Sequence, residues 1–260
     1  MSRTAARTTG AAPGGAARSP APTGPAARPH GPGAVLQGVA IAIGLVLMVG
    51  GFALIAVEYR PYRVPTDSMN PTIHPGDTVL ARKSDGADVG RGDVVVFKDA
   101  AWGDSLLVKR VVAVGGDTLV CCDSRQRLAV DGVAVDEPYL PKGSVNGSFS
   151  VKVPTGRLFL MGDNRLTSLD SREHLDRLSG TVPASDVVGR VAGTVWPASQ
   201  LGVLDRTAAF DPVGAPRAAG PGPLAAASYA SVAGALLILV TAAIGPIDGL
   251  LRRRRGGPAR

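Results

Sequence analysis

The stretch LLVKRVVAV, residues 106–114, sets two cations among Leu, Val and Ala, which is typical of a buried β-strand. In an extended chain, Lys109 shares one face with three apolar residues: Leu107, Val111 and Ala113. Arg110 shares the other face with Leu106, Val108, Val112 and Val114, so a cation lies on an apolar face whichever way the strand is turned. Burial lowers the pKa of an amine, and Lys can then lose its proton whereas Arg cannot. The stretch therefore predicts a core strand with a candidate general base, although both cations can also reach solvent or pair with acids.

Shorter apolar runs of the same kind recur on both sides of this stretch. They lie at residues 78–81, 93–97, 118–121, 128–130, 149–153, 157–161 and 187–195. Turn signals such as Pro75-Gly76-Asp77 and Gly115-Gly116-Asp117 separate them, and Asp131-Gly132 predicts a hairpin turn within residues 128–135. Short runs punctuated in this way predict a mainly β domain, an antiparallel sandwich or barrel, over residues 58–213.

A long apolar stretch precedes this domain at residues 35–57. Its 23 residues include no charge, and Gln37 is its only strongly polar side chain. A membrane span needs about 20 such residues, whereas a cleavable signal peptide has an apolar stretch of about 7–15 with a small-x-small site after it. The stretch is longer than that and runs into Glu58-Tyr59-Arg60-Pro61, so we predict an uncleaved transmembrane helix.

A second apolar stretch follows the domain at residues 224–251. A Pro-, Gly- and Ala-rich linker, residues 214–223, leads into it, and a basic tail, residues 252–260, follows. An amphipathic helix lying on the membrane surface is the alternative, but residues 232–244 show no polar face. We therefore predict a second transmembrane helix.

The charge of the chain is concentrated at its two ends. Residues 1–34 hold four Arg and no acid, and residues 248–260 hold five Arg and one Asp. Residues 58–223 hold 19 basic and 20 acidic side chains, which gives no basic groove for nucleic acid. Because Arg-rich flanks stay in the cytoplasm, the pattern predicts a multi-pass protein of the cell membrane, with both termini cytoplasmic and the domain between the spans extracytoplasmic. Residues 1–34 show no apolar period and are predicted to be a disordered cytoplasmic tail.

The usual cofactor and metal patterns are missing from the sequence. The three His residues (His30, His74 and His174) lack metal-ligand spacing, and we predict no metal and no cofactor. Cys121 and Cys122 are adjacent, and a bond between neighbours would be strained, so we interpret them as two small residues at a strand end. Their redox state stays open.

Two further stretches carry polar side chains in a fixed pattern. PTDSMNPTIHPGD, residues 65–77, begins eight residues after the first span, and its three prolines place Ser68 on a rigid turn near the bilayer. MGDNRLTSLDSR, residues 161–172, alternates Ser168, Asp170 and Arg172, so an extended chain would present them on one side. Taken alone, the first stretch is more typical of an ordinary capping or hydrogen-bonding Ser, and the second is as consistent with a solvated loop as with a polar network.

Together these stretches resemble the bacterial type I signal peptidases, the membrane-bound Ser/Lys proteases of the S26 kind. Residues 65–73 match the pattern P-[ST]-x-S-M-x-P-T-[LI], and residues 162–172 match G-D-N-R-x-x-S-x-D-S-R. Residues 108–113 and 92–97 match two further boxes, so the resemblance spans residues 35 to 200. It implies a serine endopeptidase that removes signal peptides from exported preproteins after small-x-small sites, at the lipid bilayer.

The resemblance also implies a role for each matching residue. Ser68 is the expected nucleophile and Lys109 the expected general base; the Ser68 N–H and the Thr66 hydroxyl form the expected oxyanion hole. Ser168 is expected to orient the Lys, with Asp170 and Arg172 as a supporting ion pair. Small apolar substrate pockets are expected from Val64, Met69, Ile73, Leu107 and Val108. The chain departs from the family pattern at Asp67, where relatives often carry a small residue, and in its second span; we expect the Asp67 carboxylate to point away from the oxyanion.

Two alternatives remain on the sequence alone. A self-cleaving SOS-response repressor uses the same Ser/Lys chemistry but is soluble and carries a DNA-binding domain, against which the two apolar stretches and the near-neutral middle both argue. An inactive, membrane-tethered β domain that binds exported chains would need no catalytic residues, and a cleavage assay on a preprotein separates it from an enzyme.

Overall fold

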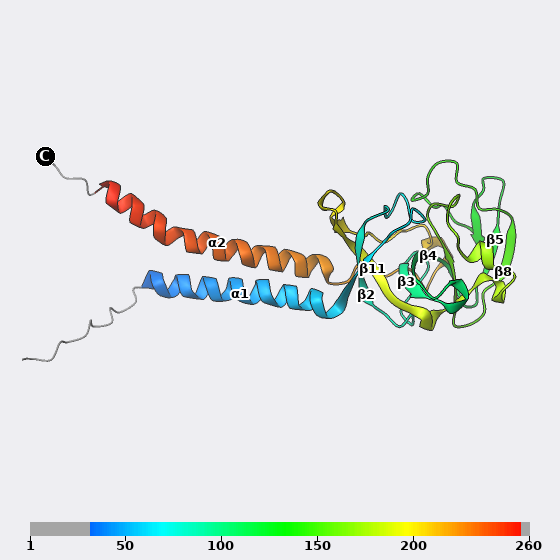
Figure 1. The fold of residues 1–260 in the computed structure, drawn as a ribbon, viewed down its shortest axis with the longest axis horizontal. Helices are drawn as coiled ribbons and strands as arrows, with labels where there is room; N and C mark the ends of the chain where they lie inside the picture. The colour runs from blue at the N-terminus through cyan, green and yellow to red at the C-terminus, as the bar shows by residue number, and fades with distance from the viewer. Residues whose placement is uncertain (1–31, 256–260) are drawn as a thin grey trace, which may run out of the picture.

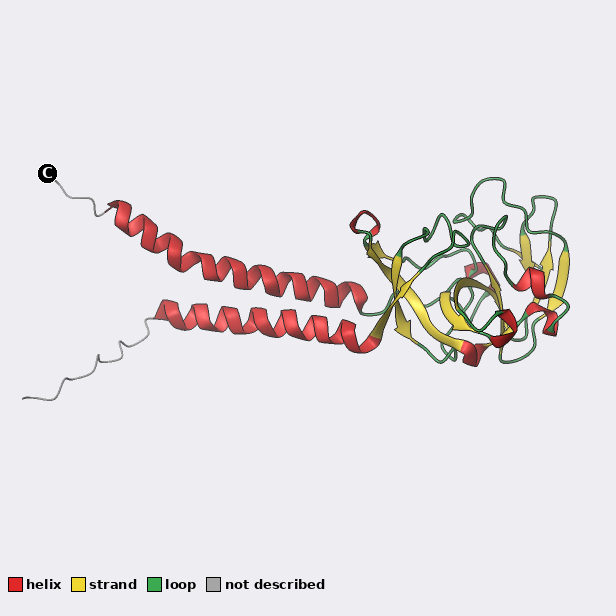
Figure 2. Ribbon diagram, viewed as in Figure 1, coloured by secondary structure: helices red, strands yellow, loops and turns green. Residues whose placement is uncertain are grey.

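Two long helices and one β domain make up the elongated molecule, a computed structural model that describes residues 32–255 (Figures 1 and 2). Helix α1, Pro32–Glu58, leads into the β domain, and helix α2, Leu224–Arg255, leads away from it beside α1. The expected disordered tail at residues 1–34 lies outside the described residues except for its last three, which begin α1. The second helix continues to Arg255, through four residues of the expected basic tail.

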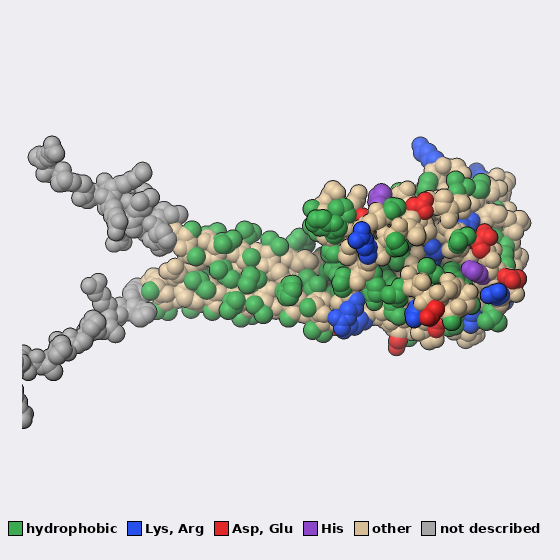
Figure 3. All heavy atoms as spheres, viewed as in Figure 1, with side chains coloured by type: hydrophobic (Ala, Val, Ile, Leu, Met, Phe, Trp, Pro, Cys, Tyr) green, Lys and Arg blue, Asp and Glu red, His purple; other side chains and the backbone are tan. Residues whose placement is uncertain are grey.

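Both helices are apolar and long enough to cross a membrane, over Gly33–Glu58 and Leu224–Ile244. Apolar side chains cover their visible surface in Figure 3, whereas Lys, Arg, Asp and Glu lie over the β domain. Glycines bring the two backbones close together: a Cβ on Gly51 would lie 2.5 Å from the Ala227 carbonyl oxygen. Gln37 donates across the pair to the Thr241 carbonyl oxygen at 3.1 Å. Small residues at such a seam are typical of paired membrane helices.

The β domain is built on a large antiparallel sheet in the strand order β1-β2-β11-β3-β4-β9-β10, with β12 paired to β11. The sheet curls around the core, as Figure 2 shows. Its strands are β1 Tyr59–Arg63, β2 Thr78–Lys83, β3 Val94–Lys98, β4 Leu106–Val114, β9 Arg157–Met161, β10 Val182–Pro183, β11 Val187–Trp196 and β12 Gly202–Val203.

A second, small antiparallel sheet, in the order β7-β6-β5-β8, lies at the end of the domain far from the helices (Figure 1). Its strands are β5 Thr118–Cys121, β6 Leu128–Val130, β7 Val133–Ala134 and β8 Phe149–Lys152. One apolar cluster joins the two sheets, because Leu119 and Leu128 of the small sheet pack with Phe159 and Met161 of β9. Cys121 ends β5 as expected, and a disulfide joins it to Cys122, a pair whose redox state the sequence left open.

The mainly β, antiparallel class predicted from sequence is confirmed, and each of the eight predicted runs forms a strand. Strand β1 was not predicted, because Pro61 interrupts its short run; Pro is tolerated there since β1 is an edge strand paired only with β2. The predicted hairpin forms between β6 and β7.

One prediction about strand β4 is wrong. The register against β9 shifts between Val111 and Ala113, which is a β-bulge. The bulge adds one residue, so Val114 rather than Ala113 joins Val111 in the same apolar cluster, and Ala113 packs in the cluster of Val112 and Phe159. Alternation therefore places side chains correctly only up to Val111.

The segment between β12 and α2, residues 204–223, packs against the β domain. Phe210 is buried in the core cluster that joins the sheets. Arg91 donates to the Pro216 carbonyl oxygen at 3.2 Å, and its guanidinium forms a buried ion pair with Asp117. Tyr59 donates to the Pro221 carbonyl oxygen at 2.9 Å. These contacts hold the start of α2 beside the end of α1.

Candidate active site

The loop between β1 and β2, residues 64–77, holds Ser68 in a closed turn. Its two ends are joined by hydrogen bonds from Val64 N to Asp77 O at 2.8 Å and from Gly76 N to Val64 O at 2.7 Å. Met69 and Ile73 are buried in one apolar cluster with Val64, which anchors the loop to the sheet. Local hydrogen bonds and apolar anchors thus hold Ser68 at one place above strand β4.

Lys109 reaches Ser68 from strand β4. Its Nζ donates to Ser68 Oγ at 2.7 Å, and both residues are buried, at 4% and 7% exposure. In the part of the chain that the structure describes, no carboxylate lies within ion-pair distance of Lys109. Burial is the main cause that lowers the pKa of Lys109, to about 8, and it outweighs the opposing influence of Asp170 and Asp163. A buried amine of this kind can exchange a proton with the hydroxyl that it contacts.

The two residues before Ser68 differ in their contacts. Thr66 Oγ1 lies 3.3 Å from Ser68 Oγ. The Asp67 carboxylate accepts hydrogen bonds from Asn164 Nδ2 at 3.3 Å and from Thr167 Oγ1 at 3.2 Å. Asp67 is therefore held toward the loop that follows β9, while Thr66 keeps its hydroxyl beside the candidate nucleophile.

That loop, residues 162–172, packs directly against Ser68. Asn164 N donates to Ser68 O at 3.0 Å. Gly162 leaves no room for a side chain, because a Cβ there would lie 2.2 Å from Ser168 Oγ and 2.4 Å from Ser68 O. Ser168 Oγ is buried and makes no hydrogen bond with any described residue. The structure therefore places Ser168 next to the site without bonding it to Lys109.

Asp170 and Arg172 form an ion pair at the far end of the same loop. Arg172 Nε and Nη2 each donate to the Asp170 carboxylate at 2.9 Å, and Gly162 N donates to it at 3.0 Å. Burial acts to raise the pKa of Asp170, but Arg172 opposes it, and the net effect is a lowered pKa. Asp170 thus stays ionised and ties Arg172 to the backbone beside Ser68.

Arg110, the second cation of β4, is paired with Asp163. Its Nη2 and Nε donate to that carboxylate at 2.6 and 2.8 Å, and both side chains are buried. Thr72 Oγ1 donates to the same carboxylate at 2.5 Å. One buried acid therefore joins β4, the loop of Ser68 and the loop after β9, and removing one partner of such a pair costs about 3–5 kcal/mol.

The residues expected to line substrate pockets divide between two clusters. Val64, Met69, Ile73 and Val108 lie in one apolar cluster, which includes the apolar anchors of the loop that carries Ser68. Leu107 packs against another cluster, with Val95 and Phe97. The structure thus gathers four of the five.

Several residues of the site received no role from the sequence. Asp163 and Arg165 lie within the motif of residues 162–172. Their place beside the other matched residues of that motif could have indicated that they belong to the site. From a distant segment, Glu137 contacts Arg165 and Tyr139 contacts Arg110, and no pattern in the sequence indicated either residue.

Comparison with known proteins agrees with the arrangement of motifs. The family model for signal peptidase, peptidase S26, matches residues 35–196. A probable signal peptidase I of Mycobacterium leprae is 34% identical over 223 residues, covering 62% of this chain and 75% of that protein. Signal peptidase I T of Bacillus subtilis is 35% identical over 162 residues, covering 56% of this chain and 80% of that protein.

Among solved structures, a signal peptidase I from Enterococcus faecalis aligns with a TM-score of 0.32 and 25% identity, over 38% of this chain and 93% of that one. The family match, which covers more than half of the chain, and the relatives from two genera agree with one another. The chain therefore belongs to the signal peptidase family, peptidase S26.

Proposed function

We propose that this protein removes signal peptides from exported preproteins with Ser68 as nucleophile and Lys109 as general base. Membership of the family supports a signal-peptide-removing serine endopeptidase. The single observation that carries the Ser/Lys assignment is the 2.7 Å contact between Lys109 Nζ and Ser68 Oγ inside a buried site.

The proposed reaction begins with neutral Lys109, which takes the Ser68 proton as Oγ attacks the carbonyl carbon of the scissile bond. The ammonium of Lys109 then returns that proton to the leaving amine, and the signal peptide remains as an acyl ester on Ser68. A water activated by the same Lys hydrolyses the ester and restores the enzyme. A pKa of about 8 leaves about a tenth of Lys109 neutral at pH 7, which is enough for this cycle.

The tetrahedral oxyanion is proposed to lie between the Ser68 N–H and the Thr66 hydroxyl. The 3.3 Å distance between Thr66 Oγ1 and Ser68 Oγ supports this assignment. Loss of one such donor typically costs about 10²–10³-fold in rate. The carboxylate of Asp67 is held by Asn164 and Thr167, so it need not face the oxyanion.

We expect the purified full chain, in detergent, to cut a preprotein immediately after an Ala-x-Ala sequence. In this proposal, small substrate side chains contact the apolar cluster of Val64, Met69, Ile73 and Val108. Replacing the last Ala before the cut by Leu should lower kcat/KM by at least about tenfold. N-terminal sequencing of the product locates the cut, and cleavage that ignores this replacement would contradict the proposed specificity.

The proposed topology is that α1 and α2 both cross the cell membrane, with both chain termini in the cytoplasm and the β domain outside. The Arg-rich flanks and the close pairing of the helices support it. Protease added to intact spheroplasts should digest residues 59–223 and leave tags at both ends intact until the membrane is permeabilised. Digestion of a C-terminal tag in intact spheroplasts would refute the two-span arrangement.

A further inference from the structure

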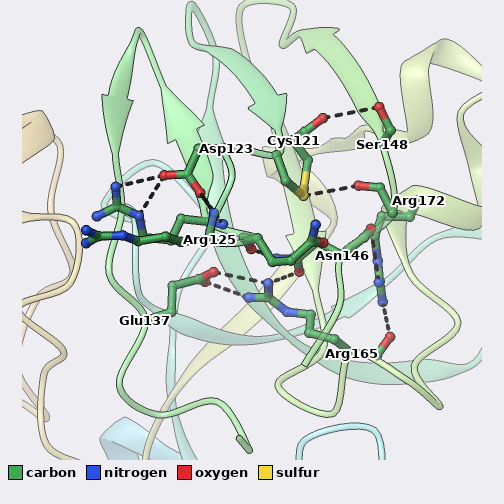
Figure 4. Close-up of a disulfide and its surroundings, with 12 residues drawn as sticks. Cys121, Asp123, Arg125, Glu137, Asn146, Ser148, Arg165 and Arg172 are labelled. Carbon is green, nitrogen blue, oxygen red and sulfur yellow. Dashed lines mark hydrogen bonds and ion pairs between the residues drawn. A yellow bond between two sulfur atoms is a disulfide. The ribbon is translucent and has the colours of Figure 1, made fainter. Parts of the chain in front are cut away.

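The segment after β7 reaches the site from outside every motif discussed above. Glu137, whose side chain is only 4% exposed, accepts hydrogen bonds from Arg165 Nη2 at 2.6 Å and from Arg165 Nη1 at 3.1 Å. Asn146 also accepts from Arg165 Nη1. Figure 4 shows Glu137 and Asn146 on the same guanidinium, close to the Cys121–Cys122 disulfide.

Tyr139 links Glu137 to a second buried Arg, Arg110. Its hydroxyl donates to Glu137, and its ring centroid lies 4.0 Å from Arg110 Cζ, a cation–π contact. Burial raises the pKa of Tyr139 well above its ordinary value, and the Glu137 charge adds to this. The phenol therefore stays protonated and can keep donating to Glu137.

Both Arg residues act on the backbone and carboxylate beside Ser68. Arg165 Nε donates to the Gly162 carbonyl oxygen at 2.9 Å, and Gly162 is packed against Ser68 O and Ser168 Oγ with no space for a Cβ. Arg110 holds Asp163, which accepts from Thr72 in the loop of Ser68. A shift of either guanidinium would therefore move the elements that bring Ser68 to Lys109.

We propose that Glu137 and Tyr139 are positioning residues that set the distance between Ser68 and Lys109 through Arg165 and Arg110. They touch none of the reacting atoms. The proposal rests on the proposed function only in naming Ser68 and Lys109 as the reacting pair. In this proposal the small sheet contributes to the reaction, because the segment that follows its strand β7 places Glu137 and Tyr139 against the loop after β9.

Loosening this loop changes the surroundings of Lys109 as well as its distance to Ser68. The charged groups that act on Lys109 are Asp170, Asp163, Arg172 and, most weakly, Asp67. Three of the four lie in the loop after β9. If that loop loosens, water reaches the amine, the desolvation that lowers its pKa weakens, and the pKa of Lys109 rises toward its ordinary value.

The test uses the full chain with Glu137→Gln, which keeps the size of the side chain but turns an amide N–H₂ donor toward Arg165. Tyr139→Phe keeps the ring over Arg110 and loses the donor to Glu137, whereas Tyr139→Leu loses both. Asp136→Asn is the matched control, because its carboxylate is 82% exposed and pairs with Arg127 at the surface. All variants are compared below their unfolding temperature.

We expect Glu137→Gln to lower kcat at least about tenfold with KM within about twofold, and to move the rising limb of the pH–rate profile up by about half a unit or more. Tyr139→Leu should change kcat and the pH–rate profile in the same way, and Tyr139→Phe should lower kcat less. Asp136→Asn should have the kcat and pH–rate profile of the wild type. The proposal would be overturned if the Glu137→Gln variant folds and keeps both the wild-type kcat and the wild-type position of the rising limb of the pH–rate profile.

A second measurement needs no protease activity. Trace acetylation of Lys109 by acetic anhydride, followed by mass spectrometry over a pH series, reports the pKa of its amine directly. The inflection should lie higher in Glu137→Gln than in Asp136→Asn, and equal inflections would overturn the positioning role. A wild type that cuts no preprotein would refute the proposed function alone, since acetylation still decides the positioning role.

Discussion

Lys109→Arg is expected to lower kcat/KM for preprotein cleavage by at least about 10⁴-fold. The guanidinium keeps the positive charge and the length of the side chain but stays protonated at every usable pH, so it cannot take the Ser68 proton. Lys109 lies at 4% exposure and donates to Ser68 Oγ at 2.7 Å, so it is the base in contact with the candidate nucleophile. Single-turnover cleavage of a purified preprotein measures the loss.

The pH–rate profile of the wild type is a second test of Lys109 as the base. If Lys109 is the base, only its neutral amine can take the Ser68 proton, so the rate should rise about tenfold per pH unit below the Lys109 pKa of about 8 and level off above it. An amine of ordinary pKa, near 10.4, would still be gaining activity at pH 10. The plateau thus reports the burial of Lys109.

Lys98→Arg is the control for this change, since it makes the same replacement on the adjacent strand β3 at a surface position paired with Asp104. It should keep the wild-type rate and pH profile. Cleavage by Lys109→Arg within about tenfold of the wild type would remove Lys109 from the role of base.

Ser68→Ala is expected to lower kcat by about 10⁴–10⁶-fold while leaving preprotein binding nearly unchanged. The change deletes one oxygen atom. The backbone contacts of the loop, including Asn164 N to Ser68 O at 3.0 Å, do not use it, so the fold and the apolar cluster of Val64, Met69 and Ile73 should persist. The variant should therefore bind a preprotein and not cut it, as fluorescence anisotropy of a labelled signal peptide would measure.

The double variant Ser68→Ala/Lys109→Arg tests whether the two residues act as one unit. If the Lys109 amine serves only to activate Ser68, the double variant should be no slower than Ser68→Ala alone. Losses that multiply would show that Lys109 acts independently of Ser68. Ser185→Ala, at an exposed Ser whose hydroxyl donates to the neighbouring Asp186, should cut at the wild-type rate.

Two features of the chain could be predicted from its sequence alone. The apolar stretches of residues 35–57 and 224–251 predict helices because their composition satisfies the length and hydrophobicity of a membrane span. The alternating runs separated by Gly, Pro and Asp predict an antiparallel β domain, because both signals are local and need no knowledge of the partner strands. The motifs around Ser68 and Lys109 also named the candidate pair, through resemblance to a family.

The arrangement of the site was decided only by tertiary structure. Periodicity put both Lys109 and Arg110 on apolar faces and left open which of them meets a carboxylate; the fold sets Asp163, 53 residues along the chain, against Arg110 and leaves Lys109 against Ser68. The bulge at Val112 could not be predicted, because it depends on the register with β9. Glu137 and Tyr139 reach the site because the small sheet folds back on β9, and a contact between segments so far apart leaves no trace in local sequence pattern.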